Sequence, residues 1–328
     1  MTARPRRRLS PAFGVLALLG SAIGAPDSSA WSQAPRTIRI VLPVPPGGSI
    51  DLLARLLAEQ ISSANGQNVI VEPRPGAGGI IATEAVARAA PDGSTLLISA
   101  NGMIISAILR KVNYDPLASF APICYLVTTP QIIVVNSEAP YRTLAELLAA
   151  VRARPGELTI ASVGPNTTQH IGIERLKRLA AADLTYVPYP GDAMAINALL
   201  GGHVTAAVLN WSEIGEHILA GKARALATMS SKHIEPLPDL PTVAESGYKD
   251  FETDVWFGVV APANTPQASV AQLIDWFSAA VVAPQVKTKL VAQALYPNPK
   301  CGADFDAHLR HQTELYTQLI HDLDIKVE

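Results

Sequence analysis

The chain has 328 residues, of which 48% are apolar and 16% are charged, and its formal net charge is −2. This composition is typical of a globular protein large enough for two domains, and it excludes a disordered chain or a coiled coil. The slightly acidic balance disfavours a nucleic-acid partner.

The first thirty residues have the pattern of an export signal. Basic residues at positions 4–8 precede an apolar run over 12–25, and small residues at Ser28–Ala30 predict cleavage before Trp31, with Ala25 as the alternative. A plain secretory signal and a twin-arginine signal both have basic residues here, so the route stays open. We expect residues 1–30 to be removed, which takes the formal net charge to −5.

The apolar run is also too short to anchor the protein. A helix needs roughly 20 apolar residues to cross a bilayer, and no comparable apolar run follows this one. No cysteine lies near the cleavage site, so a lipid anchor is not expected either. Cys124 and Cys301 are the only cysteines. In an oxidising compartment they could pair, but they are far apart in sequence, and we favour two buried thiols.

Beyond the signal, short β-branched runs alternate with amphipathic helices. This order predicts an α/β fold with parallel sheets and crossover helices, arranged in more than one sheet. The expected strands are 37–44, 68–72, 95–100, 132–136, 158–162, 184–188, 204–209, 223–229 and 256–261. The expected helices are 49–64, 79–90, 143–153, 168–182, 191–200, 211–220, 266–282, 284–294 and 303–323.

The first strand leads directly into a helix through Pro43–Asp51. Gly47 and Gly48 let a ligand oxygen approach backbone N–H groups at the positive end of the helix dipole, so this turn could bind an anion. A tight turn without a ligand is equally compatible with the pattern. Ser49 is expected to cap the helix, and Asp51 to support the loop, because its carboxylate would repel an anionic ligand.

Two further loops follow strands and precede helices. Pro75–Ile81 is rich in glycine, but it lacks the third glycine of a dinucleotide-binding turn, where Ile81 stands. Ser162–His170 offers small polar groups at the start of a helix and could oppose the first loop, although turn and cap residues explain the same pattern.

Catalytic and metal signatures are missing from the sequence. Gly47–Asp51 does not complete a Gly-x-Ser-x-Gly elbow, no Walker A loop occurs, and the seven histidines form no zinc motif. We therefore expect no enzyme, no cofactor and no metal.

The combined motifs resemble the substrate-binding proteins of tripartite tricarboxylate transporters, the Bug/TctC family. The resemblance covers nearly all of the chain beyond the signal. It is carried by Ile38–Val41, Pro45–Asp51, Val71–Gly79, Ala90–Gly93, Tyr114–Pro116, Phe120–Pro122, Pro155–Leu158, Ser162–His170, Val187–Tyr189, Leu200–Gly202, Ala220–Lys222, Arg224–Ala227, Leu240–Glu245 and Trp256–Gly258.

The resemblance implies a periplasmic binding protein fold of type II, with two lobes, each built on a central, mostly parallel sheet, and a ligand cleft between them. We expect 31–130 plus 258–328 to form the first lobe and 131–257 the second. It further implies that a small organic acid binds, partly through waters, to Gly47, Gly48 and Ser49 and to Gly164, Asn166, Thr167 and Thr168. Our predicted ligand-binding set adds Gly78, Gly79, Ser162, His170 and Asn210.

Several positions depart from the family pattern. Ser94 replaces the usual Tyr, Ile171–Ile173 replaces Leu-Ala-Gly, and Asn210 stands where many relatives have Asp. An Asp there could pair with an amino group, so neutral Asn210 argues against an amino-acid ligand.

The expectation is thus a monomeric periplasmic receptor that closes by hinge motion on a small organic acid and delivers it to membrane transporter subunits. Two alternatives remain. The same fold could act as a ligand sensor for a membrane kinase, or the Gly47–Asp51 turn could serve an exported α/β hydrolase or transferase.

Overall fold

The computed structural model describes residues 37–165 and 167–325. The predicted export signal and Asn166 lie outside this part of the chain. The strands are β1 Ile38–Leu42, β2 Val69–Pro73, β3 Thr95–Ala100, β4 Phe120–Asn136, β5 Thr159–Val163, β6 Thr185–Tyr189, β7 Ala206–Asn210, β8 Ala223–Thr228, β9 Asp254–Pro262 and β10 Tyr296–Cys301.

The helices fill the intervals between the strands. They are α1 Ser49–Asn65, the short 3-10 helix η1 Ala77–Gly79, α2 Ile80–Ala87, α3 Gly102–Leu109, α4 Leu144–Ala153, α5 Thr168–Ala180, α6 Asp192–Leu200, α7 Trp211–Leu219, α8 Gln267–Val282, α9 Pro284–Ala292 and α10 Ala303–Asp322. Most begin and end within two residues of the predicted positions, because caps and glycines mark their ends.

Two sheets share strand β4. In sheet A, β1 pairs in parallel with β2 and β3, while β9 pairs antiparallel with β3 and β4, and β10 with β4. In sheet B, β5 pairs in parallel with β6 and β7, and β4 pairs antiparallel with β7 and β8. The sheets are therefore mixed rather than mostly parallel, and every antiparallel pair contains β4 or β9.

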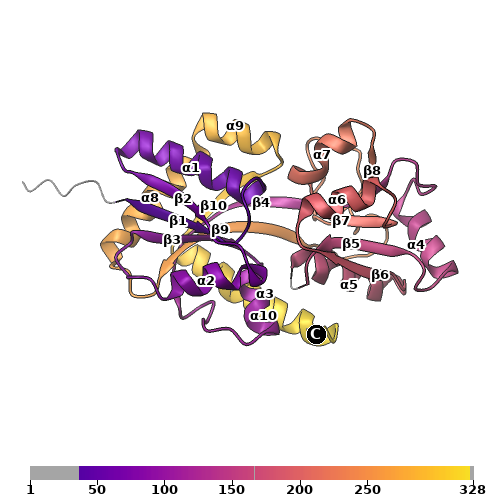
Figure 1. Cartoon of the computed structure of the whole chain (residues 1–328), viewed down its shortest axis with the longest axis horizontal. Helices are drawn as coiled ribbons and strands as arrows, with labels where there is room; N and C mark the ends of the chain where they lie inside the picture. The colour runs from indigo at the N-terminus through magenta and orange to yellow at the C-terminus, as the bar shows by residue number, and fades with distance from the viewer. Residues whose placement is uncertain (1–36, 166, 326–328) are drawn as a thin grey trace, which may run out of the picture. The chain divides into compact units, whose positions relative to one another are not determined.

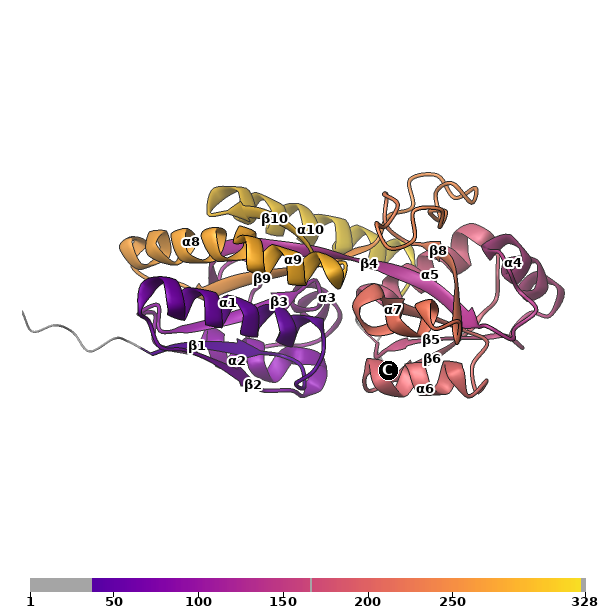
Figure 2. The ribbon, with the colours of Figure 1, turned by 90° about the horizontal axis from the view of Figure 1, so that it is seen from above.

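Strand β4 changes partners between Pro130 and Gln131. Residues up to Pro130 pair with β9, and those from Gln131 onward pair with β7. Viewed from above, β4 runs from the sheet A half to the sheet B half (Figure 2). Our predicted lobe boundaries were 130 and 257, and β9 begins at Asp254. We keep the division into two lobes as a proposal. The strands of sheet A with the helices packed on them are called the sheet A half, and the strands of sheet B with their helices the sheet B half.

Each sheet is covered by helices on both faces (Figure 1). Apolar side chains of α1, α8 and α9 pack on one face of sheet A, and those of α2, α3 and α10 pack on the other. In the sheet B half, α4 and α5 cover one face, and α6 and α7 cover the other. The buried faces of these helices hold each strand–loop–helix junction in place.

The cysteine prediction was wrong. Cys124 and Cys301 form a disulfide, although 177 positions separate them in the sequence. Cys301 lies opposite Cys124 where β10 pairs antiparallel with β4, and this pairing places the two side chains side by side. Sequence distance was a poor guide because sheet topology sets the spatial distance.

Candidate functional site

The first predicted loop connects β1 to α1. Gly48, in an extended conformation, is the N-cap of α1, so Ser49 is the first helical residue and not the cap that the sequence predicted. Ser49 is nevertheless buried. The first backbone N–H groups of a helix have no partner within it, so this turn offers donors to a ligand or to another part of the chain.

Asp51 holds this loop from inside the helix. Its Oδ2 accepts hydrogen bonds from the Gly47 N–H at 3.1 Å and from Arg55 Nε at 2.9 Å. Burial raises the pKa of Asp51, but the bonds from Arg55 and Gly47, together with the Arg55 charge, outweigh it and lower the pKa. The Gly47 N–H is thus engaged internally, and the other donors of this turn lie at the start of α1, where the backbone and hydroxyl of Ser49 face Glu213.

The second glycine cluster, in the loop from Pro75 to Ile81, packs against the first loop. Gly78 and Gly79 have φ values of +66° and +93°. A Cβ atom at Gly79 would lie 2.9 Å from Pro43 Cβ, so the backbone here packs against the first loop. This contact gives Gly79 a supporting position, and the predicted ligand contact of both glycines stays a prediction.

The second predicted loop connects β5 to α5. Thr167 is the N-cap of α5, and its Oγ1 accepts from the His170 N–H and donates to the Val163 carbonyl oxygen at 2.9 Å. Gly164 has a φ of +46° with open space around its Cβ position. Asn166 lies outside the described residues. Among those described, no hydrogen bond joins this loop directly to the first loop.

Tyr186, on β6, supports the second loop and was not identified from the sequence. Its hydroxyl lies 3.1 Å from Ser162 Oγ and donates to the Gly164 carbonyl oxygen at 2.7 Å. The ring of His170 stacks on the Tyr186 ring at a centroid distance of 4.4 Å, and burial lowers the pKa of His170. The Ser162 hydroxyl is therefore used to hold the loop.

The start of α5 also meets the sheet A half. Thr168, at the first position of α5, faces the hydroxyl of buried Tyr316 on α10. Asn101 Nδ2 donates to the same Tyr316 hydroxyl at 2.7 Å, and Asn101 Oδ1 accepts from the Trp256 N–H at 3.1 Å. Thr168 thus lies at the junction between the halves.

Two acidic residues that the sequence analysis missed lie at the same junction. Asp192 starts α6, and Glu213 lies in the first turn of α7 beside Ser49 of α1. Burial, and then the charge of Asp192, raises the pKa of Glu213 to about 8, with part of the rise offset by Ser212 and Ser49. Burial likewise raises the pKa of Asp192 to about 6. Each follows a strand and opens a helix, as both predicted loops do, and that signal could have found them.

Asn210 is the N-cap of α7, at the end of β7. Its side chain is 7% exposed and makes no capping hydrogen bond, and its Oδ1 is buried without a partner among the described residues. Asn210 precedes Glu213 in the sequence, and both lie at the start of α7.

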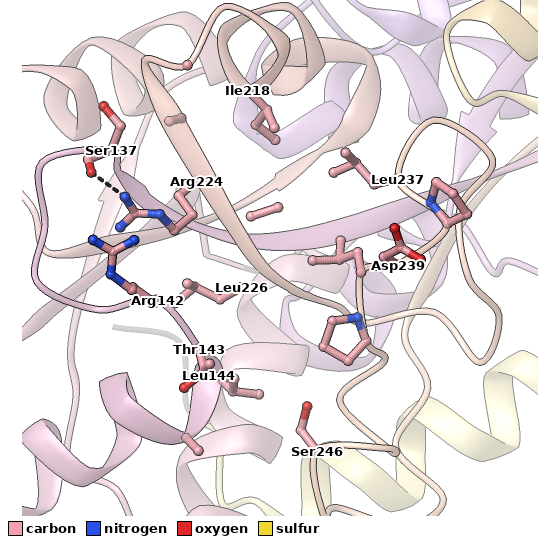
Figure 3. A pocket seen from close by; sticks show the side chains of 17 residues that line it. Ser137, Arg142, Thr143, Leu144, Ile218, Arg224, Leu226, Leu237, Asp239 and Ser246 are labelled. Carbon is pink, nitrogen blue, oxygen red and sulfur yellow. Dashed lines mark hydrogen bonds between the residues drawn. The ribbon is translucent and has the colours of Figure 1, made fainter.

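A separate hollow of about 670 Å³ lies in the sheet B half, along β8 (Figure 3). Its lining is mostly apolar, and it contains none of the predicted site residues. Arg224, at its rim, donates to the carbonyl oxygens of Ser137, Ala139 and Tyr141 at 2.6, 3.1 and 3.0 Å. This guanidinium is thus engaged in holding the β4–α4 connection.

Membrane-spanning helices and clusters of metal ligands are both absent from residues 37–165 and 167–325. No helix there has the length and apolar character needed to cross a membrane. Within the same residues, no three His, Cys, Asp or Glu side chains gather in an arrangement that could hold a metal ion.

Comparison with known proteins places the chain in a family. The sequence model described as "Tripartite tricarboxylate transporter family receptor" matches residues 53–324. Protein BugT of Bordetella pertussis is 34% identical over 293 residues, which cover 88% of this chain and 89% of BugT.

Solved structures agree with this match. An R. palustris protein with adipate is 30% identical, with a TM-score of 0.84 over 90% of this chain and 99% of its own. MatC from Rhodopseudomonas palustris with bound malate is 29% identical, with a TM-score of 0.79 over 87% of this chain and 99% of MatC. The chain therefore belongs to the tripartite tricarboxylate transporter family receptors, the Bug/TctC family of periplasmic solute-binding proteins.

Proposed function

We propose that this protein captures a small organic carboxylate between its sheet A and sheet B halves and delivers it to a tripartite membrane transporter. The observation that carries the proposal is the burial of two helix starts at the junction of the halves. Ser49 of α1 faces Glu213 of the sheet B half, and Thr168 of α5 faces Tyr316 of the sheet A half. Helix starts favour anions because their N–H groups and dipole point toward the ligand.

The bound ligands of two similar proteins support the chemical class. Adipate and malate are both dicarboxylates, and each is bound by a protein about 30% identical to this chain. Micromolar binding requires about −8 kcal/mol, and hydrogen bonds to a charged group contribute about 1.5–3 kcal/mol each. A few such bonds, with burial of a short carbon skeleton, can supply that energy after the costs of association.

A thermal-shift screen of mono-, di- and tricarboxylates on the purified protein tests the proposal. A ligand at 100 times its Kd adds about 2.7 kcal/mol to the free energy of unfolding, which raises the Tm by several degrees. A screen in which no carboxylate raises the Tm would refute the proposed clamp.

Gly47→Val locates the site, and Gly66→Val is its matched control. Both glycines have positive φ values, +101° and +65°, and open space around Cβ, so both substitutions introduce backbone strain of at least about 1–2 kcal/mol. Gly66 lies at the other end of α1, after the last helical residue. We expect both variants to lower the Tm of the free protein, and only Gly47→Val to abolish the ligand-dependent rise.

A further inference from the structure

The start of α7 and the neighbouring start of α6 carry buried carboxyl and amide oxygen atoms without hydrogen-bond partners among the described residues. Asp192 Oδ1, Asn210 Oδ1 and Glu213 Oε2 are each buried, and none has a partner among the described residues. A buried polar atom without a partner costs about 1–3 kcal/mol, and more when the group is charged. Three such acceptors therefore favour a ligand that brings donors.

These acceptors border the proposed carboxylate site. The Glu213 carboxyl lies against the backbone and hydroxyl of Ser49, which begins α1, and Asp192 lies close enough to Glu213 for its charge to act on it. Asn210, which is 7% exposed, occupies the N-cap position of the helix that carries Glu213. If the carboxylate of a ligand binds at the start of α1, the remaining atoms of the ligand would thus contact these acceptors.

The charge balance of this region is unfavourable for a ligand that is only an anion. The charged group acting on Glu213 is another acid, Asp192, and no lysine or arginine of the described residues is among the groups that shift the pKa of either. Arg55, on the helix that follows the first loop, is paired with Asp51. A plain dicarboxylate would bring a second carboxylate beside two acids whose pKa values are raised and on which no cation of the described residues acts.

We infer that the cargo carries a protonated amine as well as a carboxylate, so that its ammonium group lies between Asp192 and Glu213 while its carboxylate lies at the start of α1. An amino acid or a similar small aminocarboxylate has this chemistry. An ammonium group supplies three N–H donors for the three unpartnered oxygens and one positive charge for the acidic pair. The inference rests on the proposed function, and it reverses the expectation drawn from neutral Asn210.

The test compares carboxylates that differ only in an amino group. Succinate against aspartate, and adipate against 2-aminoadipate, are titrated calorimetrically into the purified protein after removal of bound ligand. We expect the amino member of at least one pair to bind tenfold or more tightly than its plain counterpart. If the plain member of each pair binds equally well or better, the inference is wrong while the carboxylate clamp stands. If no member of either pair binds, the inference is refuted, and the clamp is refuted with it only when the thermal-shift screen is also negative.

Glu213→Gln assigns the effect to the acidic pair. The substitution keeps the size of the side chain but removes its ability to ionise beside an ammonium group, so it should weaken the aminocarboxylate at least tenfold more than the plain carboxylate. Glu216→Gln, an exposed position on the same helix, is the matched control and should change neither. Asp192→Asn repeats the test independently. Equal weakening of both ligand types by Glu213→Gln would overturn the inference.

Discussion

Replacing both Cys124 and Cys301 by Ala should cost several kcal/mol of stability. The disulfide closes a loop across 177 positions, and in the chain-entropy description such a cross-link destabilises the unfolded state by about 5 kcal/mol at 25 °C. Cys124 is fully buried in β4, whereas β10, which carries Cys301, pairs with no strand other than β4 among the described residues. The bond therefore also holds β10 on the sheet.

Urea unfolding followed by tryptophan fluorescence measures this cost. We expect the double variant to lose about 2–5 kcal/mol relative to the oxidised protein, the range found when native disulfides are removed. The reduced wild-type protein should unfold near the double variant, which separates loss of the cross-link from the change of side chain. Both cysteines belong to sheet A, so ligand affinity well below the unfolding transition should persist. A loss below about 1 kcal/mol would refute the entropic reasoning.

Two further perturbations test the packing and the buried acid. Gly258→Ala should destabilise the protein by about 1–3 kcal/mol in urea unfolding, because its Cβ would lie 2.4 Å from buried Phe305, and adding Phe305→Leu should recover part of that loss; an unchanged free energy of unfolding would contradict the close contact. Between its ordinary pKa of 4.5 and the raised value of about 8, Glu213 holds a proton in the folded state that the unfolded chain has released, so stability should fall as pH rises through this interval. Unfolding measured from pH 5 to pH 8.5 should show a shallower fall in Glu213→Gln, and identical slopes would refute the raised pKa.

Local signals predicted most of the helices and strands. Apolar periodicity and the glycine at position 66 marked α1 to within one residue of its observed end. Where local signals conflicted with tertiary pairing, prediction failed. Strand β10 contains Pro297 and Pro299, which argue against a strand, but it lies at a sheet edge where missing N–H donors are tolerated. Pro122 and Pro130 likewise argue against a strand in the first part of β4, and the sequence analysis missed that part.

The candidate site shows the same difference between what local signals predict and what tertiary contacts decide. The sequence identified the loops after β1 and β5, because glycines, small polar residues and helix starts are local features of a βα junction. Only the structure shows the hydrogen bonds inside these loops. Tyr186 donates to the second loop from the neighbouring strand, and Asp51 accepts from the Gly47 N–H. No local pattern shows which donors are already engaged.

By itself, the sequence determined the fold class, the family and the two loops that we propose as the clamp, since these depend on periodicity and on short motifs. Only the tertiary structure decided that Cys124 bonds to Cys301 and that Glu213 lies against Ser49. Both contacts join segments more than 150 positions apart, and strand order and the crossing of β4 between the sheets bring them together. Long-range pairing of this kind leaves no periodic trace in the chain, which is why the acidic pair beside the proposed ligand site emerged only from the structure.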